Sequence, residues 1–259
     1  MEIIITSNPE EVCKKLASII AQRIKDKPTS VLALAAGTTM LGTYRELIRL
    51  HREEGLDFSQ VTVFGVDEYV GLAKEHPCSY HAIMRTSFYD HVNIRPKNIF
   101  IPDGMNKNVK QESQEYEDKI KSVGGIDICA LGISEDGHIG FNEPSSSLSS
   151  RTRAKMLTEK TRYERSRFFP DGNVPRHVIT MGIGTILDSK EVLIAAFGSR
   201  KSDIVAKVIE GPITAMVPAS ALQMHTNVKV AIDEDAAKEL KMKDYYRWAY
   251  EQKKLIPGY

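Results

Sequence analysis

The stretch IDICALGISEDGHIGFNEP, residues 126–144, combines a core strand with a cluster of titratable side chains. Its opening run, IDICALGI, is nearly continuous in apolar residues, which is typical of a strand buried on both faces. The run leads into a loop that carries Asp136, His138 and Glu143 with two glycines between them. Titratable groups directly after a buried strand indicate a ligand site at the carboxyl end of that strand.

Similar apolar runs recur along the chain and alternate with helical patterns. Asn8 and Pro9 form a helix start signal, and apolar residues from Val12 to Ile24 then recur at helical spacing. Further strands are expected at residues 1–6, 31–36, 61–66, 98–102, 177–183, 191–197 and 228–232, and further helices at 80–91 and 110–121. This alternation predicts an α/β fold: an open, mostly parallel sheet with helices on both faces.

One domain over residues 1–259 is expected, because no linker, low-complexity segment or repeat divides the chain. The least sheet-like region is residues 145–175, which are rich in Ser, Arg and Lys. Two interpretations of this region stay open. It is either a lid-like excursion over the site or an exposed polar helix and loop.

Charge and cysteine content exclude several classes of protein. The chain has 35 basic and 34 acidic residues, a balance that predicts no nucleic-acid partner and no anionic-membrane partner. Three widely spaced cysteines form neither a disulfide framework nor a paired metal motif. The first residues, MEIIITSNPEE, lack a signal peptide's basic region, and no apolar run is long enough to span a bilayer. A cytoplasmic protein with a small ligand is expected.

Polar clusters also follow the expected strands at 31–36 and 61–66. Gly37 and Thr38 come at a strand-to-helix turn, where backbone N–H groups can face a phosphate, although an ordinary threonine-capped turn fits equally. Asp67 follows the next strand and is a candidate general base, with a helix or turn cap as the alternative. If the sheet is parallel, these groups share one edge with the loop at 134–144.

Asp136, His138 and Glu143 together suggest a proton relay, because flanking carboxylates can hold an imidazole in one tautomer. Metal ligation and a purely structural loop are the alternatives. The chain lacks paired-histidine spacing, so we expect no metal. The last group of candidates is cationic. Lys201 comes just past the end of an expected strand, where its ammonium group could bind a phosphate. The other cations are Arg151, Arg153, Lys155, Arg162, Arg165, Arg167 and Arg200.

An anion-binding turn, a carboxylate base and a His/acid relay point to a small phosphorylated substrate. No Ser or Cys stands in a recognisable nucleophile elbow. Proton transfer next to a carbonyl therefore fits better than acyl transfer.

At this point the chain resembles the glucosamine-6-phosphate deaminase family over nearly its whole length. The motifs that carry the resemblance are DEYVGL at 67–72, SYH at 79–81, DGHIGFNEP at 136–144, SRTR at 150–153, SRFF at 166–169 and ITMGIGTILDSKEV at 179–192. The resemblance implies a Rossmann-like open sheet and conversion of glucosamine 6-phosphate and water into fructose 6-phosphate and ammonia. It implies no cofactor.

The resemblance also implies a role for each candidate residue. Asp67 would move a proton from C2 to C1 of the opened sugar. His138 would catalyse ring opening, with Asp136 and Glu143 tuning and orienting it. The substrate phosphate would be held by Gly37, Thr38, Arg167 and Lys201.

Two further expectations come from the family. Ser146, Arg153 and Lys155 match part of an allosteric site for N-acetylglucosamine 6-phosphate, and a homo-oligomer, possibly a hexamer, is expected. The chain departs from the family at Ala35 and Ala36, where a hydroxyl residue and a glycine are common. The alternatives are the same chemistry on galactosamine 6-phosphate, a 6-phosphogluconolactonase-like hydrolase and a non-catalytic sugar-phosphate sensor.

Overall fold

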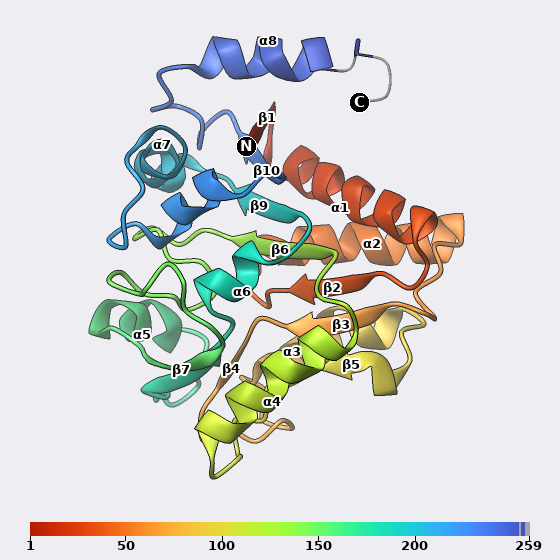
Figure 1. Ribbon diagram of the computed structural model, residues 1–259, viewed down its shortest axis with the longest axis vertical. Helices are drawn as coiled ribbons and strands as arrows, with labels where there is room; N and C mark the ends of the chain where they lie inside the picture. The colour runs from red at the N-terminus through yellow and green to blue at the C-terminus, as the bar shows by residue number, and fades with distance from the viewer. Residues whose placement is uncertain (254, 257–259) are drawn as a thin grey trace.

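Seven parallel strands form the main sheet of the computed structural model, which describes residues 1–253, 255 and 256 (Figure 1). Each pair of neighbouring strands is parallel. Their order across the sheet is β1 (Glu2–Thr6), β10 (Val228–Asp233), β9 (Val192–Ala196), β6 (Ile128–Gly132), β2 (Val31–Leu34), β3 (Thr62–Gly65) and β5 (Ile99–Phe100). The predicted open parallel sheet is confirmed.

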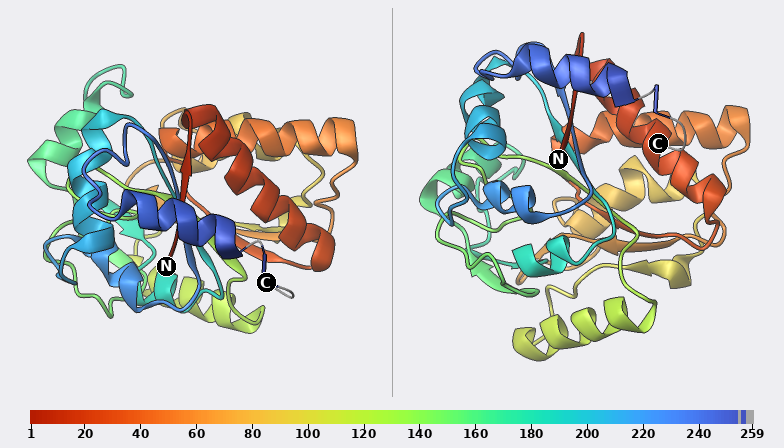
Figure 2. Two further views of the ribbon diagram at one scale, coloured as in Figure 1. Left: turned by 90° about the horizontal axis from the view of Figure 1, so that it is seen from above. Right: turned by 45° about the horizontal axis from the view of Figure 1, so that its top comes forward.

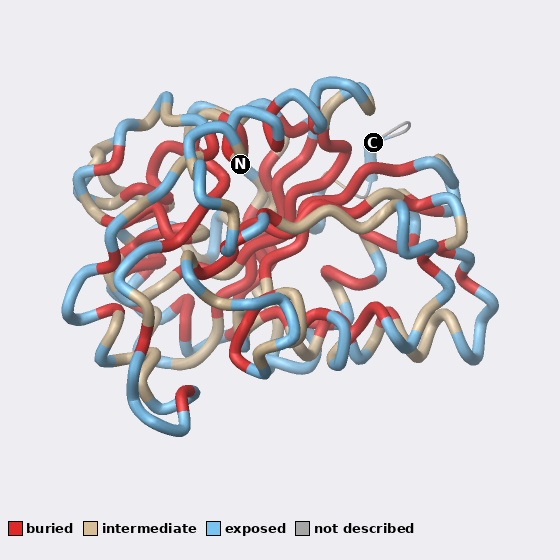
Figure 3. Tube along the Cα trace, turned by 90° about the horizontal axis from the view of Figure 1, so that it is seen from below, coloured by how far each residue is buried: buried red, intermediate tan, exposed pale blue. Residues whose placement is uncertain are grey.

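Helices cover both faces of this sheet, because alternate residues of each strand point to opposite sides. On β6, Ile128 and Ala130 pack with one set of helices and Cys129 and Leu131 with the other. The first face carries α1 (Pro9–Asp26), α2 (Leu41–Glu54) and α3 (Tyr80–Ser87), and the second carries α4 (Val109–Ser122), α6 (Ile183–Leu187) and α7 (Ser202–Glu210). The buried strands run through the centre of the molecule (Figure 3).

The predicted start of α1 is confirmed in detail: the Asn8 side chain accepts a hydrogen bond from the Glu11 N–H at 3.0 Å, and Pro9 opens the first turn. The predicted helix at 80–91 is shorter, because α3 ends before Phe88 leaves the helical region (φ −147°) and a 3₁₀ turn follows. The last helix, α8 (Lys243–Lys253), crosses the β1 edge of the sheet (Figure 2). Within the described residues, no helix is long and apolar enough to cross a bilayer.

A second, antiparallel sheet of three strands lies beside the carboxyl ends of the main strands. Its order is β4 (Asp67–Tyr69), β8 (His177–Thr180) and β7 (Arg153–Met156). The sequence pattern predicts residues 177–183 as a strand of the parallel sheet, and that placement is wrong: β8 pairs with β4, which continues the chain directly from β3. An apolar run predicts a strand but not its partner, which packing selects.

The segment at 145–175 contains both β7 and the helix α5 (Glu159–Ser166). Strand β7 belongs to the small sheet, so the segment is not a single excursion from the fold. Residues 163–168, at the end of α5, line a cavity at the carboxyl edge of the main sheet. In Figure 1, α5 and β7 lie on the side toward which the arrowheads of the main strands point.

Candidate active site

The cavity has a volume of about 540 Å³, which suits a small ligand. Residues that follow β2, β3, β6 and β9 line it, as the rule for parallel sheets predicts. Six of the predicted site residues line the cavity: Gly37, Thr38, Asp67, His138, Arg167 and Lys201. Asp136 and Glu143 do not line it but contact His138 from behind.

Asp67 is a buried carboxylate, 8% exposed, at the junction of the two sheets. Its Oδ1 atom is buried and accepts no hydrogen bond within the described structure. Burial raises the pKa of Asp67 from 3.8 to about 6, although Thr180 and His138 favour the ionised form. Asp67 is therefore mostly ionised at neutral pH and still basic enough to accept a proton.

Gly140 lies next to Asp67, and its missing side chain leaves room for the Asp67 carboxylate. It has a left-handed backbone (φ +58°), and a Cβ there would lie 2.9 Å from Thr180 Oγ1 and 3.2 Å from Asp67 Oδ1. Thr180 is the register partner of Asp67 in the small sheet and accepts a hydrogen bond from the Phe141 N–H at 3.0 Å. The loop after β6 thus approaches Asp67 closely only because residue 140 has no side chain.

Glu68, the neighbouring acid, points away from this cavity. Its carboxylate accepts hydrogen bonds from the N–H groups of Tyr69, Tyr80 and His81, and so caps the N-terminus of α3. Burial raises the pKa of Glu68 to about 7, against the effect of these donors. The helix cap that was the alternative for Asp67 is therefore supplied by its neighbour, Glu68.

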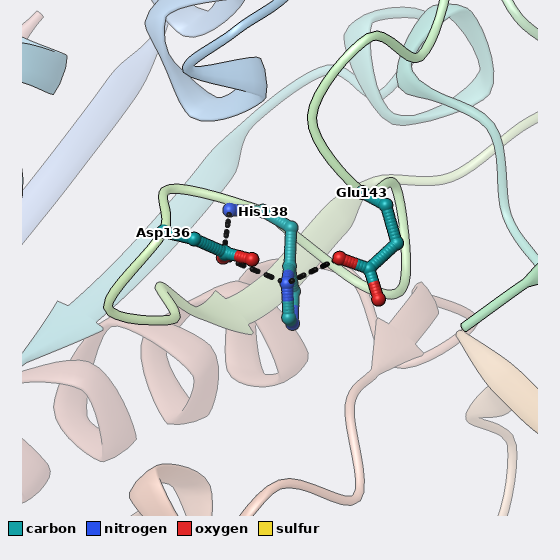
Figure 4. A group of neighbouring side chains, drawn as sticks. All are labelled: Asp136, His138 and Glu143. Atoms are coloured by element: carbon teal, nitrogen blue, oxygen red, sulfur yellow. Dashed lines mark hydrogen bonds and ion pairs between the residues drawn. The ribbon is translucent and has the colours of Figure 1, made fainter. Parts of the chain in front are cut away.

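His138 lies between two carboxylates, as Figure 4 shows. Its Nδ1 atom is 2.8 Å from Asp136 Oδ1 and 3.6 Å from Glu143 Oε2. Burial opposes protonation of the ring, but the two acids outweigh it and raise the pKa of His138. With Nδ1 held by the acids, Nε2 is the nitrogen left to exchange protons with a ligand.

Hydrogen bonds from different segments hold the two acids in place. Asp136 Oδ1 accepts hydrogen bonds from the Ser134 hydroxyl and, at 3.2 Å, from the His138 N–H. Burial disfavours its charge, yet His138 and Ser134 bring the pKa of Asp136 well below its ordinary value. Glu143 accepts a hydrogen bond from the Thr158 N–H at 3.2 Å, at the start of α5, and contact with His138 likewise lowers its pKa against the effect of burial.

The predicted phosphate-binding residues line the same cavity, together with the acids Glu135 and Glu164. Gly37 and Thr38 lie where the chain leaves β2, and Lys201 lies in the 3₁₀ turn after β9. Burial lowers the pKa of Lys201, so an anion beside it would be strongly favoured. Arg167 is exposed, with its guanidinium carbon 4.8 Å from the ring centre of Phe168. Gly37 has an ordinary φ of −67°, and a Cβ added there would meet nothing within 4 Å, so the fold itself does not require glycine here.

The three predicted allosteric residues lie outside the cavity. Ser146 is buried and donates a hydrogen bond to the Glu143 carbonyl at 2.7 Å, while Arg153 donates to Asn142 Oδ1 at 2.9 Å. Lys155 lies on β7, two residues from Arg153. Two of the three therefore contact the chain segment that supports His138.

Sequence reasoning assigned no role to several residues of the cavity wall, among them Tyr80, Phe141 and Arg165. The two aromatic residues belong to a small buried cluster that packs the second sheet against the site. Arg165 is not distinguished from the surface cations by sequence, because a helix of mostly charged residues does not reveal which of its faces meets a cavity.

Comparison with known proteins agrees with this geometry. Residues 7–231 match the family of glucosamine-6-phosphate isomerases/6-phosphogluconolactonase. A glucosamine-6-phosphate deaminase from Rhodococcus opacus is 48% identical over 98% of both chains. Among solved structures, a monomeric glucosamine-6-phosphate deaminase superposes with a TM-score of 0.90 at 44% identity, over 92% of this chain and 100% of that one. A 6-phosphogluconolactonase from Trypanosoma brucei shares the fold at 19% identity (TM-score 0.76, over 92% and 98%). The chain belongs to the glucosamine-6-phosphate deaminase family.

Proposed function

We propose that this protein converts glucosamine 6-phosphate and water into fructose 6-phosphate and ammonia, with Asp67 as the proton-transfer base and His138 as the ring-opening residue. The observation that carries the assignment is that a raised-pKa carboxylate and a carboxylate-held imidazole line one cavity together with the predicted phosphate-binding residues. The proposal takes residues 1–259 as one catalytic domain, because the cavity wall comes from β2, near the start, and β9, near the end.

Ring opening requires a proton to move between the sugar's O1 and its ring oxygen. His138 suits this step because its Nδ1 is held by Asp136 and Glu143, which stabilise the protonated ring and leave Nε2 for the substrate. Asp136 and Glu143 would act through His138 as positioning residues, since neither lines the cavity.

Asp67 would carry out the isomerisation. Its carboxylate takes the proton from C2 of the open-chain sugar, the C–H electron pair forms the C1–C2 double bond, and the carbonyl electrons move to O1. When the proton returns to C1, the nitrogen lone pair forms the C2–N double bond and a proton passes from the nitrogen to O1, which leaves a hydroxyl on C1 and an imine at C2. Water adds to that carbon and ammonia leaves, which yields fructose 6-phosphate. The substrate's own amine and carbonyl supply the electronic pathway, so we propose no cofactor.

The phosphate would lie in the part of the cavity lined by the predicted phosphate-binding residues. Backbone N–H groups near Gly37, the Thr38 hydroxyl, Lys201 and Arg167 are the proposed contacts. Ala35 and Ala36 also line the cavity, so the departure from the family pattern lies at the ligand itself. This departure therefore bears on the preference of the protein between glucosamine 6-phosphate and galactosamine 6-phosphate.

An ammonia-release assay tests the function. We expect ammonia from glucosamine 6-phosphate, less from galactosamine 6-phosphate, and no effect of a chelator, although the ligand atoms of Asp136, His138 and Glu143 lie within 4.8 Å of one another and would also suit a cation. Ammonia from neither sugar, with hydrolysis of 6-phosphogluconolactone instead, would establish the lactonase alternative. Tight sugar-phosphate binding without turnover would establish the sensor.

Regulation and assembly are tested separately. We propose that Ser146, Arg153 and Lys155 contribute to a site for N-acetylglucosamine 6-phosphate and that the protein is a cytoplasmic homo-oligomer, with a hexamer as the family expectation. Contacts of Ser146 and Arg153 with the segment next to Glu143 support the first part. The 44%-identical relative of known structure is described as monomeric, which favours the opposite state. Sedimentation analysis, and kinetics with and without the effector, decide both points.

A further inference from the structure

Arg165 is a cation inside the proposed active site that none of the proposed roles uses. It lies in the last turn of α5, is partly buried and lines the cavity. Among the described residues, its guanidinium makes neither a hydrogen bond nor an ion pair. Other arginines of the same region are paired: Arg151 with Glu117 and Asp188, and Arg153 with Asn142. A partly desolvated cation without a partner is costly unless a ligand or a nearby charge compensates it.

The aromatic wall of the cavity holds this cation. The Arg165 guanidinium carbon is 5.4 Å from the ring centre of Phe141, within the range of a cation–π contact. The Phe141 ring in turn lies 5.9 Å from the His138 ring and 5.9 Å from the Tyr80 ring. Arg165 therefore lies over an aromatic residue that is next to His138 and whose backbone N–H donates a hydrogen bond to Thr180, the register partner of Asp67.

Arg165 lines the same cavity as Asp67. Burial raises the pKa of Asp67, and the charge of Arg165 acts in the opposite direction, toward the ionised carboxylate. His138 from the loop after β6 and Arg165 from α5 both favour the ionised form of Asp67. Around Arg165 itself, Tyr80, Tyr69, Asp67 and Glu164 favour its charge, and Arg165 in turn adds to burial in lowering the pKa of Lys201 after β9. Unlike His138, Arg165 keeps its charge through the whole catalytic pH range.

We propose that Arg165 balances the negative charge of the proton-transfer step, on Asp67 before the transfer and on the substrate oxygen after it. The inference rests on the proposed function. When Asp67 takes the C2 proton, its carboxylate becomes neutral and one negative charge passes through the new C1–C2 double bond to O1. A fixed cation in the wall of the same cavity would stabilise the negative charge before and after the transfer without reorganisation.

The experiment compares the pH profile of kcat/KM for wild type, Arg165→Met and Arg165→Lys, with glucosamine 6-phosphate as substrate. Lys160→Met is the matched control, because Lys160 belongs to the same helix, is exposed and lies outside the cavity lining. Thermal unfolding of each variant checks folding, and competition by inorganic phosphate reports on the phosphate end.

Without Arg165, the acid limb of kcat/KM should move upward by about one pH unit, because the Asp67 carboxylate loses a fixed cation that favours its ionised form. We expect kcat at neutral pH to fall about 10- to 100-fold, with partial recovery in Arg165→Lys and no change in Lys160→Met or in phosphate inhibition. If Arg165→Met does not fold, a smaller upward shift of the acid limb of kcat/KM in Arg165→Lys still supports the role of Arg165.

Three results would overturn the proposal. If the wild type is active and the acid limb of kcat/KM does not move in either Arg165 variant, the role of Arg165 is wrong and the proposed function stands. A variant that mainly raises KM and weakens phosphate inhibition, with an unmoved limb, makes Arg165 a phosphate contact instead. A wild type that releases no ammonia overturns the proposed function, and this role of Arg165 falls with it.

Discussion

Asp67 and Asp136 lie just beyond the carboxyl ends of two parallel strands, β3 and β6, and both interact with the same histidine. Their states are opposite. Burial leaves the Asp67 Oδ1 atom without a hydrogen bond and raises the residue's pKa to about 6. Asp136 accepts bonds from Ser134 and from the His138 backbone, touches the His138 ring, and has a pKa well below its ordinary value.

The difference shows that the role of a carboxylate is set by what surrounds it. Donors that stabilise the charge of Asp136 also make it a poor base, which suits a group that only holds an imidazole. Burial of Asp67 makes it a better base at a cost in stability. The two acids should therefore respond in opposite ways to the same substitution, and three experiments test that contrast.

The largest effect is expected for Asp67→Asn on turnover. Removing the proposed base should lower kcat about 10³-fold or more, while KM changes little, because the phosphate end of the cavity is untouched. Asp136→Asn should lower kcat less, because Asp136 acts only through His138. Steady-state ammonia release measures both, and near-normal turnover of Asp67→Asn would contradict the assignment.

Stability should change in opposite directions. A buried carboxyl whose pKa is about 6 in the folded state instead of 3.8 costs on the order of 3 kcal/mol when fully ionised at pH 8. Asp67→Asn removes that cost, so the variant should be more stable than wild type at pH 8, and the gain should disappear as pH falls toward 4, where Asp67 is protonated.

Asp136→Asn should instead be less stable at neutral pH, by about 1–3 kcal/mol, because it breaks the contacts that favour the charged acid. Its lowered pKa means that this contribution is complete above about pH 4 and is lost only in stronger acid. Urea unfolding at pH 8, 6 and 4 measures both variants. If the two substitutions changed the free energy of unfolding in the same direction at pH 8, the contrast between the two acids would be wrong.

The smallest effect is expected for Gly140→Ala, which changes the space next to Asp67 and not its charge. A methyl group there would press on Thr180 Oγ1 and Asp67 Oδ1, and displacement of the base should lower kcat about 10-fold. Gly172→Ala is the control, because Gly172 also has a left-handed backbone (φ +68°) but nothing within 4 Å of its Cβ position. Both variants should lose roughly 1 kcal/mol of stability, and equal kcat values would show that the close approach is irrelevant.

Much of the fold was predictable, because strands buried on both faces carry a strong local pattern. The strands β2, β6 and β9 are each predictable from their apolar runs, as is the N-cap of α1. The run at 177–183 predicts a strand but not its sheet, since the same apolar pattern serves either partner. Arg165 was assigned no role because the sequence of α5 does not distinguish a charge over a cavity from one in water.

The sequence by itself determined that polar groups follow four strand ends and that Asp67, Asp136, His138 and Glu143 are the chemical candidates. Only the tertiary structure decided that Asp67 is buried with a raised pKa, that Asp136 and Glu143 contact His138 without lining the cavity, and that Arg165 lines the same cavity as Asp67. The physical reason is that a pKa depends on burial and on charges across space. Those distances arise from the packing of β4 and α5 against the main sheet, which no local spacing of residues encodes.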